Sequence, residues 1–224
     1  MPRPDSWITT PPAGYTGPRI ALVHGLAAGR HMERHLLAFL REAGFADTTL
    51  FSHYARPAAL ADHLADPTTT GRARVLIGYS QGGFQCVKAA QALAARDVTV
   101  DLLVTVAAGG AGRFFFPQIG FNPRRIPGNV QHCLNYFAEG DPLGSDVIHH
   151  LNLAQAEAST TRIENIAYPR AARLGHIGIV RCFPTERVAP AVRHLFLDRL
   201  QQELAALRQG LRETSNCDQH GGSA

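Results

Sequence analysis

Short apolar segments alternate with amphipathic segments along most of this chain, and that alternation limits the fold more than any other feature. Buried strands are predicted at residues 19–23, 48–51, 74–77, 100–107, 130–138 and 162–166. Helices are predicted at residues 30–43, 58–64 and 80–95 and, as a long amphipathic helix, within 185–212. Strands that alternate with helices form a mostly parallel sheet with helices on both faces. The sequence therefore predicts an α/β fold.

The 224 residues suit one domain with a single core. The alternating pattern occupies residues 19–213, whereas residues 1–18 are rich in Pro, Gly and Thr and are predicted to be an irregular lead-in. Residues 214–224 are polar and rich in Gly, which predicts a disordered tail. No apolar run approaches the roughly 18 residues that cross a bilayer, and the first residues lack the apolar core of a secretory signal. We therefore expect no membrane span and a cytoplasmic protein.

Composition excludes some classes of partner. The formal net charge is +4, and the arginines are spread along the chain rather than clustered as in a nucleic-acid footprint. A nucleic-acid partner is therefore not expected. The four cysteines form no C-x-x-C pair and have no zinc-like spacing with histidine, so no metal site is expected. Cys86 and Cys133 lie in apolar stretches and are predicted to be buried thiols.

The segment Gly78-Tyr79-Ser80-Gln81-Gly82 connects a predicted buried strand to an Ala-rich helix. A serine in this position is held in a tight turn that exposes its hydroxyl, and side chains at 78 and 82 would collide with neighbouring backbone. The free N–H groups at the start of the helix can stabilise a developing anion, and that of Gln81 is the expected donor. Ser80 is therefore the predicted nucleophile.

A second strand end supplies a second candidate donor. Acyl transfer needs at least two donors aimed at the oxyanion, and the other one comes from the loop after an earlier strand. That loop here is His24-Gly25-Leu26, in which Gly25 permits close approach and Leu26 offers its backbone N–H. His24 is predicted to bond nearby backbone, while His31 and His35 on the following helix are predicted to face solvent.

A serine hydroxyl needs a base, and the base needs an orienting carboxylate. Asp141 follows the strand at residues 130–138, at the carboxyl end where sites form in open sheets, with Asp146 and Glu139 as alternatives. His176 lies in a Gly-flanked loop between the last strand and the last helix, which lets its ring reach Ser80. The remaining histidines after Asp141 are less suitable. His149 and His150 lie too close to the acid, His194 lies inside the last helix, and His220 lies in the tail.

Together, His24-Gly25, the Gly-Tyr-Ser-Gln-Gly motif around Ser80, Gly140-Asp141 and Gly175-His176 resemble the α/β-hydrolase superfamily over residues 19–210. The size is similar to small members with a short or absent lid, such as compact lipases, cutinase-like esterases and acyl-thioesterases. The serine motif is similar to that of cutinases. The resemblance implies a serine hydrolase without metal or organic cofactor.

The resemblance also implies a reaction. An ester or thioester is cleaved through an acyl-enzyme, in which Ser80 attacks, His176 moves the proton and Asp141 orients His176. An acyltransferase with the same triad and a non-catalytic binding protein with the same fold are the alternatives. Residues 111–128 hold the aromatic side chains that are predicted either to line an acyl pocket, to form a short lid or to pack inward: Phe114, Phe115, Phe116 and Phe121.

Overall fold

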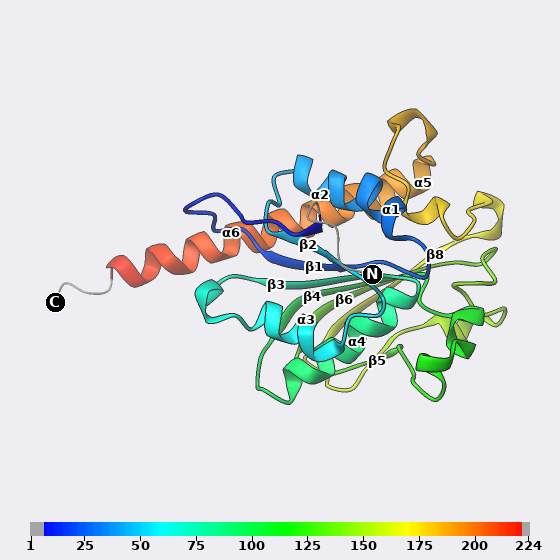
Figure 1. The fold of residues 1–224 in the computed structure, drawn as a ribbon, viewed down its shortest axis with the longest axis horizontal. Helices are drawn as coiled ribbons and strands as arrows, with labels where there is room; N and C mark the ends of the chain where they lie inside the picture. Colours follow the sequence, from blue (N-terminus) through cyan, green and yellow to red (C-terminus); the bar gives the residue numbers. More distant parts are fainter. Residues whose placement is uncertain (1–6, 221–224) are drawn as a thin grey trace.

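The computed structural model describes residues 7–220 and contains a six-stranded sheet in the order β2-β1-β3-β4-β6-β8 (Figure 1). Every strand pairing within this sheet is parallel. Its strands are β1 (Arg19–Val23), β2 (Thr48–Phe51), β3 (Arg74–Tyr79), β4 (Val100–Val106), β6 (Val130–Ala138) and β8 (Arg162–Tyr168). A separate two-stranded ladder pairs β5 (Arg125–Ile126) with β7 (Gln155–Ala156). The predicted parallel α/β architecture is confirmed.

Helices cover both faces of the sheet (Figure 1). One face carries α1 (Gly29–Met32) and α2 (Ala38–Glu42), joined by a π-helical turn, together with α5 (Pro190–Val192) and α6 (Arg199–His220). The other face carries α3 (Pro57–Leu64) and α4 (Gln81–Ala94). The sheet is thus the middle of three layers.

The apolar strands contribute to two cores because successive side chains of a strand point to opposite faces. Ile20 of β1 packs with α1, α2 and α6, whereas the next residue, Ala21, packs with α3 and α4. The central strands are therefore apolar at nearly every position. This double burial explains why they appear in the sequence as continuous apolar runs rather than as an alternating pattern.

Apart from shifts at strand ends, the structure departs from the predicted elements in segment 111–128 and at the C-terminus. Within residues 111–128, predicted to be a loop, there are 3₁₀ turns at Gly110–Phe114 and Phe116–Gln118 and the strand β5. The C-terminal helix α6 continues to His220, so residues 214–220 are helical where a disordered tail is predicted. Predictions for residues 1–6 and 221–224 lie outside the described residues.

Two further sequence predictions concern burial and the membrane. Cys86 and Cys133 are buried free thiols, as predicted, and so is Cys182. Among residues 7–220 no helix combines the length and the apolar character that a membrane span requires.

Candidate active site

Ser80 lies between the carboxyl end of β3 and the first residue of α4, in a strained backbone conformation. Its φ is 53° and its ψ is −122°, a region that non-glycine residues rarely adopt. The Ser80 N–H donates to the carbonyl of Val106 at 2.8 Å, and its carbonyl accepts the N–H of Gly83 at 2.9 Å. These backbone bonds hold the sharp turn that the sequence predicts.

Glycine is required around this turn because other backbone comes very close. A Cβ at Gly82 would lie 2.1 Å from the carbonyl oxygen of Val23, and one at Gly78 would lie 2.5 Å from the carbonyl oxygen of Gly82. A Cβ at Gly25 would lie 2.7 Å from the Cβ of Ser80 and 3.2 Å from its Oγ. The loop after β1 therefore passes directly beside the serine hydroxyl.

The structure brings Ser80, His176 and Asp141 into one chain of hydrogen bonds. Nε2 of His176 lies 2.9 Å from Oγ of Ser80, and Nδ1 lies 2.7 Å from Oδ2 of Asp141. An ionised carboxylate can only accept, so the ring proton belongs on Nδ1, and Nε2 is left to accept the serine O–H. Asp141 is 2 % exposed, and its Oδ1 accepts the N–H of Leu143 at 3.1 Å. The arrangement can take a proton from Ser80.

The two alternative carboxylates have other partners. Asp146 binds the guanidinium groups of Arg113 and Arg124. Glu139 lies within 3.3 Å of His149 Nδ1 and accepts the backbone N–H of Arg170. Among the three acids considered from the sequence, Asp141 is the one that bonds His176.

The loop that carries His176 is held by side chains from other elements. Tyr79, at the end of β3, donates its hydroxyl to the carbonyl of His176 at 3.0 Å. Nδ1 of His35 accepts the backbone N–H of Phe183 at 3.1 Å and that of Cys182 at 3.4 Å. The loop is therefore anchored at His176 itself and again at Cys182 and Phe183.

His31 and His35 do not face solvent as predicted; both are half-buried. Their rings lie 4.1 Å apart by centroid, against the loop after His176. Burial, with the charges of His35 and Arg181, lowers the pKa of His31 to about 4. The periodicity of their helix gave no sign of this contact, because the residues of the covering loop that bond His35 lie 147 and 148 positions further along the chain.

The two predicted oxyanion donors, Leu26 and Gln81, belong to backbone that lies next to Ser80. Gln81 is the first residue of α4, where backbone N–H groups have no partner within the helix, and Leu26 directly follows Gly25 beside Ser80. The side chain of Gln81 is buried and donates Nε2–H to the carbonyl of Gly112 at 2.7 Å. That bond ties the start of α4 to the segment that carries the aromatic residues. Leu26 keeps its side chain 54 % exposed.

His24 and His53 form a buried pair beside the loop that follows β1. Nδ1 of His24 donates to the carbonyl of Gly25 at 2.6 Å, in agreement with the predicted backbone contact. His53 follows β2, is 5 % exposed, and its ring lies 5.4 Å from that of His24. Neither ring nitrogen of His53 has a hydrogen-bond partner among the described residues. Burial, with the charge of His24, lowers the pKa of His53 to about 4, so His53 is neutral near pH 7.

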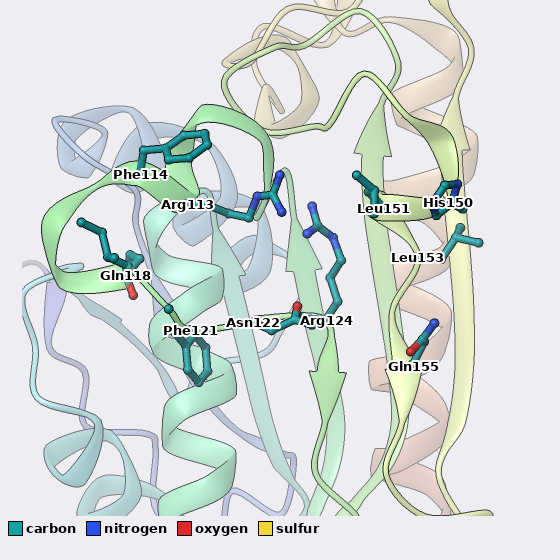
Figure 2. A pocket seen from close by; sticks show the side chains of 12 residues that line it. Arg113, Phe114, Gln118, Phe121, Asn122, Arg124, His150, Leu151, Leu153 and Gln155 are labelled. Carbon is teal, nitrogen blue, oxygen red and sulfur yellow. Dashed lines mark hydrogen bonds between the residues drawn. The ribbon is translucent and has the colours of Figure 1, made fainter.

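The four aromatic residues of segment 111–128 separate into different environments. Phe114 and Phe121 line a cavity of about 510 Å³, which Figure 2 shows. Phe115 is half-buried, with its ring 6.4 Å from that of His53. Phe116 is 86 % exposed. A shared acyl pocket for all four stays a prediction. Among the side chains that the structure describes, which end at residue 209, no group of three or more His, Cys, Asp or Glu is placed to hold a metal ion.

Comparison with known proteins identifies the architecture. No protein-family model matches the sequence, and no curated protein matches it either. An esterase from Pyrobaculum calidifontis superposes with a TM-score of 0.56 at 15% identity, over 88% of this chain and 78% of the other. The chain has the α/β-hydrolase fold. Two further solved structures have this similarity: an alpha/beta hydrolase superfamily protein from Enterococcus faecalis and a thioesterase from the prodiginine pathway of Streptomyces coelicolor.

These two α/β-hydrolase-fold structures are also distant in sequence. The Enterococcus faecalis protein has a TM-score of 0.53 at 11% identity and covers 87% of this chain and 92% of its own. The Streptomyces coelicolor thioesterase has a TM-score of 0.50 at 12% identity and covers 91% and 97%. At such identities the similarity establishes the fold, and the function depends on the site itself.

Proposed function

We propose that this protein is a serine hydrolase that cleaves a carboxylic ester or thioester through an acyl-enzyme intermediate. The observation that carries the proposal is the hydrogen-bond chain from Ser80 Oγ to His176 Nε2, at 2.9 Å, and from His176 Nδ1 to Asp141 Oδ2, at 2.7 Å. A nucleophile, a base and an orienting acid at these distances are the arrangement that acyl transfer requires. The esterase and the thioesterase with the same fold support this class of substrate.

Acylation begins when Nε2 of His176 takes the Ser80 proton as Oγ attacks the carbonyl carbon. The carbonyl oxygen becomes an oxyanion, which the backbone N–H groups of Leu26 and Gln81 bind. Asp141 stabilises the imidazolium that forms. His176 then gives its proton to the leaving alkoxide or thiolate, and the acyl group stays on Ser80.

Deacylation repeats the sequence with water as the nucleophile. His176 takes a proton from water, and the resulting hydroxide equivalent attacks the acyl carbon. The second tetrahedral intermediate collapses as His176 returns the proton to Ser80 Oγ, and the carboxylic acid leaves. Each proton that the base accepts is thus returned, so the cycle needs no cofactor.

The decisive test is covalent labelling with a fluorophosphonate probe, which reacts with an activated serine. We expect the wild-type protein to be labelled and Ser80→Ala to be unlabelled. Ser52→Ala is the matched control, because Ser52 also follows a strand of the same sheet and its Oγ accepts the N–H of Tyr54 rather than facing His176. Labelling that persists in Ser80→Ala, or is missing from the wild type, would contradict the proposal.

The products distinguish hydrolysis from transfer. A panel of p-nitrophenyl esters and acyl-thioesters should release free carboxylic acid in proportion to the leaving group. Release of the leaving group without the free acid, when an alcohol or amine acceptor is present, would instead indicate an acyltransferase.

A further inference from the structure

The cavity of about 510 Å³ is separate from the candidate catalytic residues, since Ser80, Asp141 and His176 do not line it. Figure 2 shows Phe114 and Phe121 on one wall and Leu151 and Leu153 on the opposite wall. The guanidinium groups of two arginines, Arg113 and Arg124, lie between these walls (Figure 2). The cavity thus combines apolar sides with cationic groups at one end.

The charges around this cavity do not cancel. Arg113 and Arg124 share one carboxylate, that of Asp146, and each binds a different oxygen of it. Asp146 does not line the cavity, and neither does any other Asp or Glu among the described residues. Two guanidinium groups and one carboxylate leave one positive charge. In addition, Nε of Arg113 is buried without a hydrogen-bond partner in the described part of the chain.

Hydrogen bonds of Asp146 and Arg124 connect the two walls of the cavity. The N–H of Asp146 donates to Oδ1 of Asn152 at 2.7 Å, and the N–H of Gln155 donates to the carbonyl of Arg124 at 2.7 Å. Parallel pairing of β5 with β7 also connects the segments that carry the two walls. A cavity with walls fixed in this way loses little conformational entropy when a ligand binds.

We propose that this cavity is a binding site for an amphipathic organic monoanion, a carboxylate that carries an apolar body. The carboxylate accepts the N–H groups of Arg113 and Arg124 that face the cavity, and the body lies between Phe114, Phe121 and Leu151. A single negative charge matches the unbalanced charge, and a partly buried cation is stabilised when it is paired. The volume falls within the roughly 300–1,000 Å³ of small-molecule sites. This inference stands independently of the proposed hydrolase function.

The probe for a binding test is octanoate, titrated into the wild-type protein by calorimetry, with acetate, 1-octanol and inorganic phosphate as comparison ligands. We expect octanoate to bind at least tenfold more tightly than each of the other three. Acetate lacks the apolar body, octanol lacks the charge, and phosphate is a strongly hydrated bare anion. Equal affinity for octanoate and octanol would show that the arginines do not take part, and equal affinity for phosphate would show a bare anion site; either result overturns the proposal.

Octanoate is also the acid product of an octanoyl ester, so it can occupy the active site of a hydrolase. Variants of the cavity therefore test where the bound octanoate lies. Arg113→Gln removes the unbalanced charge and leaves Asp146 paired with Arg124, so octanoate affinity should fall at least tenfold. Arg173→Gln, in an exposed arginine on the His176 loop, is the matched control and should bind octanoate as the wild type does.

A second variant protects the test against a folding defect. Ile119 is exposed at the edge of the cavity, so Ile119→Asp adds a negative charge there without a buried cavity or an unpaired buried group. It should also weaken octanoate binding at least tenfold. Octanoate that binds Arg113→Gln and Ile119→Asp as tightly as it binds the wild type occupies another site, and the proposal is then wrong. Loss of Ser80 labelling in the wild type would refute the hydrolase proposal and leave this result unchanged.

Discussion

Replacing Asp141 with asparagine tests the proposed mechanism at the atom that orients the base. Oδ1 of Asp141 accepts the N–H of Leu143 at 3.1 Å, and Oδ2 faces Nδ1 of His176 at 2.7 Å. In Asp141→Asn, only the amide oxygen can accept the N–H of Leu143. The amide NH₂ therefore faces His176 and donates to Nδ1. The imidazole proton then moves to Nε2, which can no longer accept the proton of Ser80.

The size of this effect follows from the protonation state rather than from lost packing. The wrong tautomer of a triad histidine lowers kcat by about 10⁴-fold, which is about 5.5 kcal/mol in activation free energy. Asparagine has nearly the shape of aspartate and keeps the bond to Leu143, so the melting temperature should change little. The assay is steady-state hydrolysis of a p-nitrophenyl ester, with a thermal melt of each variant.

Variants of the two other acids in this region serve as comparisons, one for activity and one for stability. Glu139→Gln alters an exposed carboxylate that does not contact His176, so kcat should stay within about twofold. Asp146→Asn leaves Arg113 and Arg124 without their shared carboxylate, which should lower the free energy of unfolding by about 3 kcal/mol. The reasoning is refuted if Asp141→Asn keeps more than a tenth of the activity, or if Glu139→Gln loses as much as Asp141→Asn.

Three further predictions concern the residues around the site. Gly25→Ala should lower kcat at least about 100-fold in the same ester assay, because the added methyl lies 2.7 Å from Cβ of Ser80 and displaces the loop that carries the proposed oxyanion donor Leu26; unchanged kcat would contradict the close approach. His35→Leu removes the acceptor of two backbone N–H groups on the loop after His176, so urea unfolding should show a loss of about 1–3 kcal/mol. Wild-type stability should fall as the pH decreases from about 6.5 to about 4, because burial holds His53 and His31 neutral while the unfolded chain takes up a proton at each. His53→Leu should show a smaller fall in melting temperature over that range, and an equal fall would exclude a contribution from His53.

Much of the sheet is predictable because its signals are local. The predicted bounds of β1, β2 and β6 agree with the structure, since each strand is rich in apolar or β-branched residues and ends at a polar or turn-forming segment. The last strand, β8, extends two residues beyond its predicted end at 166. The sharp turn at Ser80 is also predictable from neighbouring residues, because the glycines around it are needed where the structure brings backbone segments close together.

The histidines show where local signals end. His31 and His35 have the sequence pattern of an exposed helix face, yet the loop after His176 covers them. His53 follows a short strand in the same way as any loop residue, and the rings that pack near it include those of His24 and Phe115, from distant segments. Burial of a polar residue depends on which distant segment packs on it, and neither helical period nor turn composition encodes that segment.

By itself, the sequence determined the parallel α/β architecture, the turn at Ser80 and the chain order of candidate serine, acid and histidine. Apolar periodicity and glycine placement are properties of neighbouring residues, so they can be read along the chain. Only the tertiary structure decided that His176 bonds Asp141 while Asp146 pairs with two arginines. These partners are separated by about 20 to 35 positions in sequence, and their pairing depends on how the loops at the carboxyl edge of the sheet pack together.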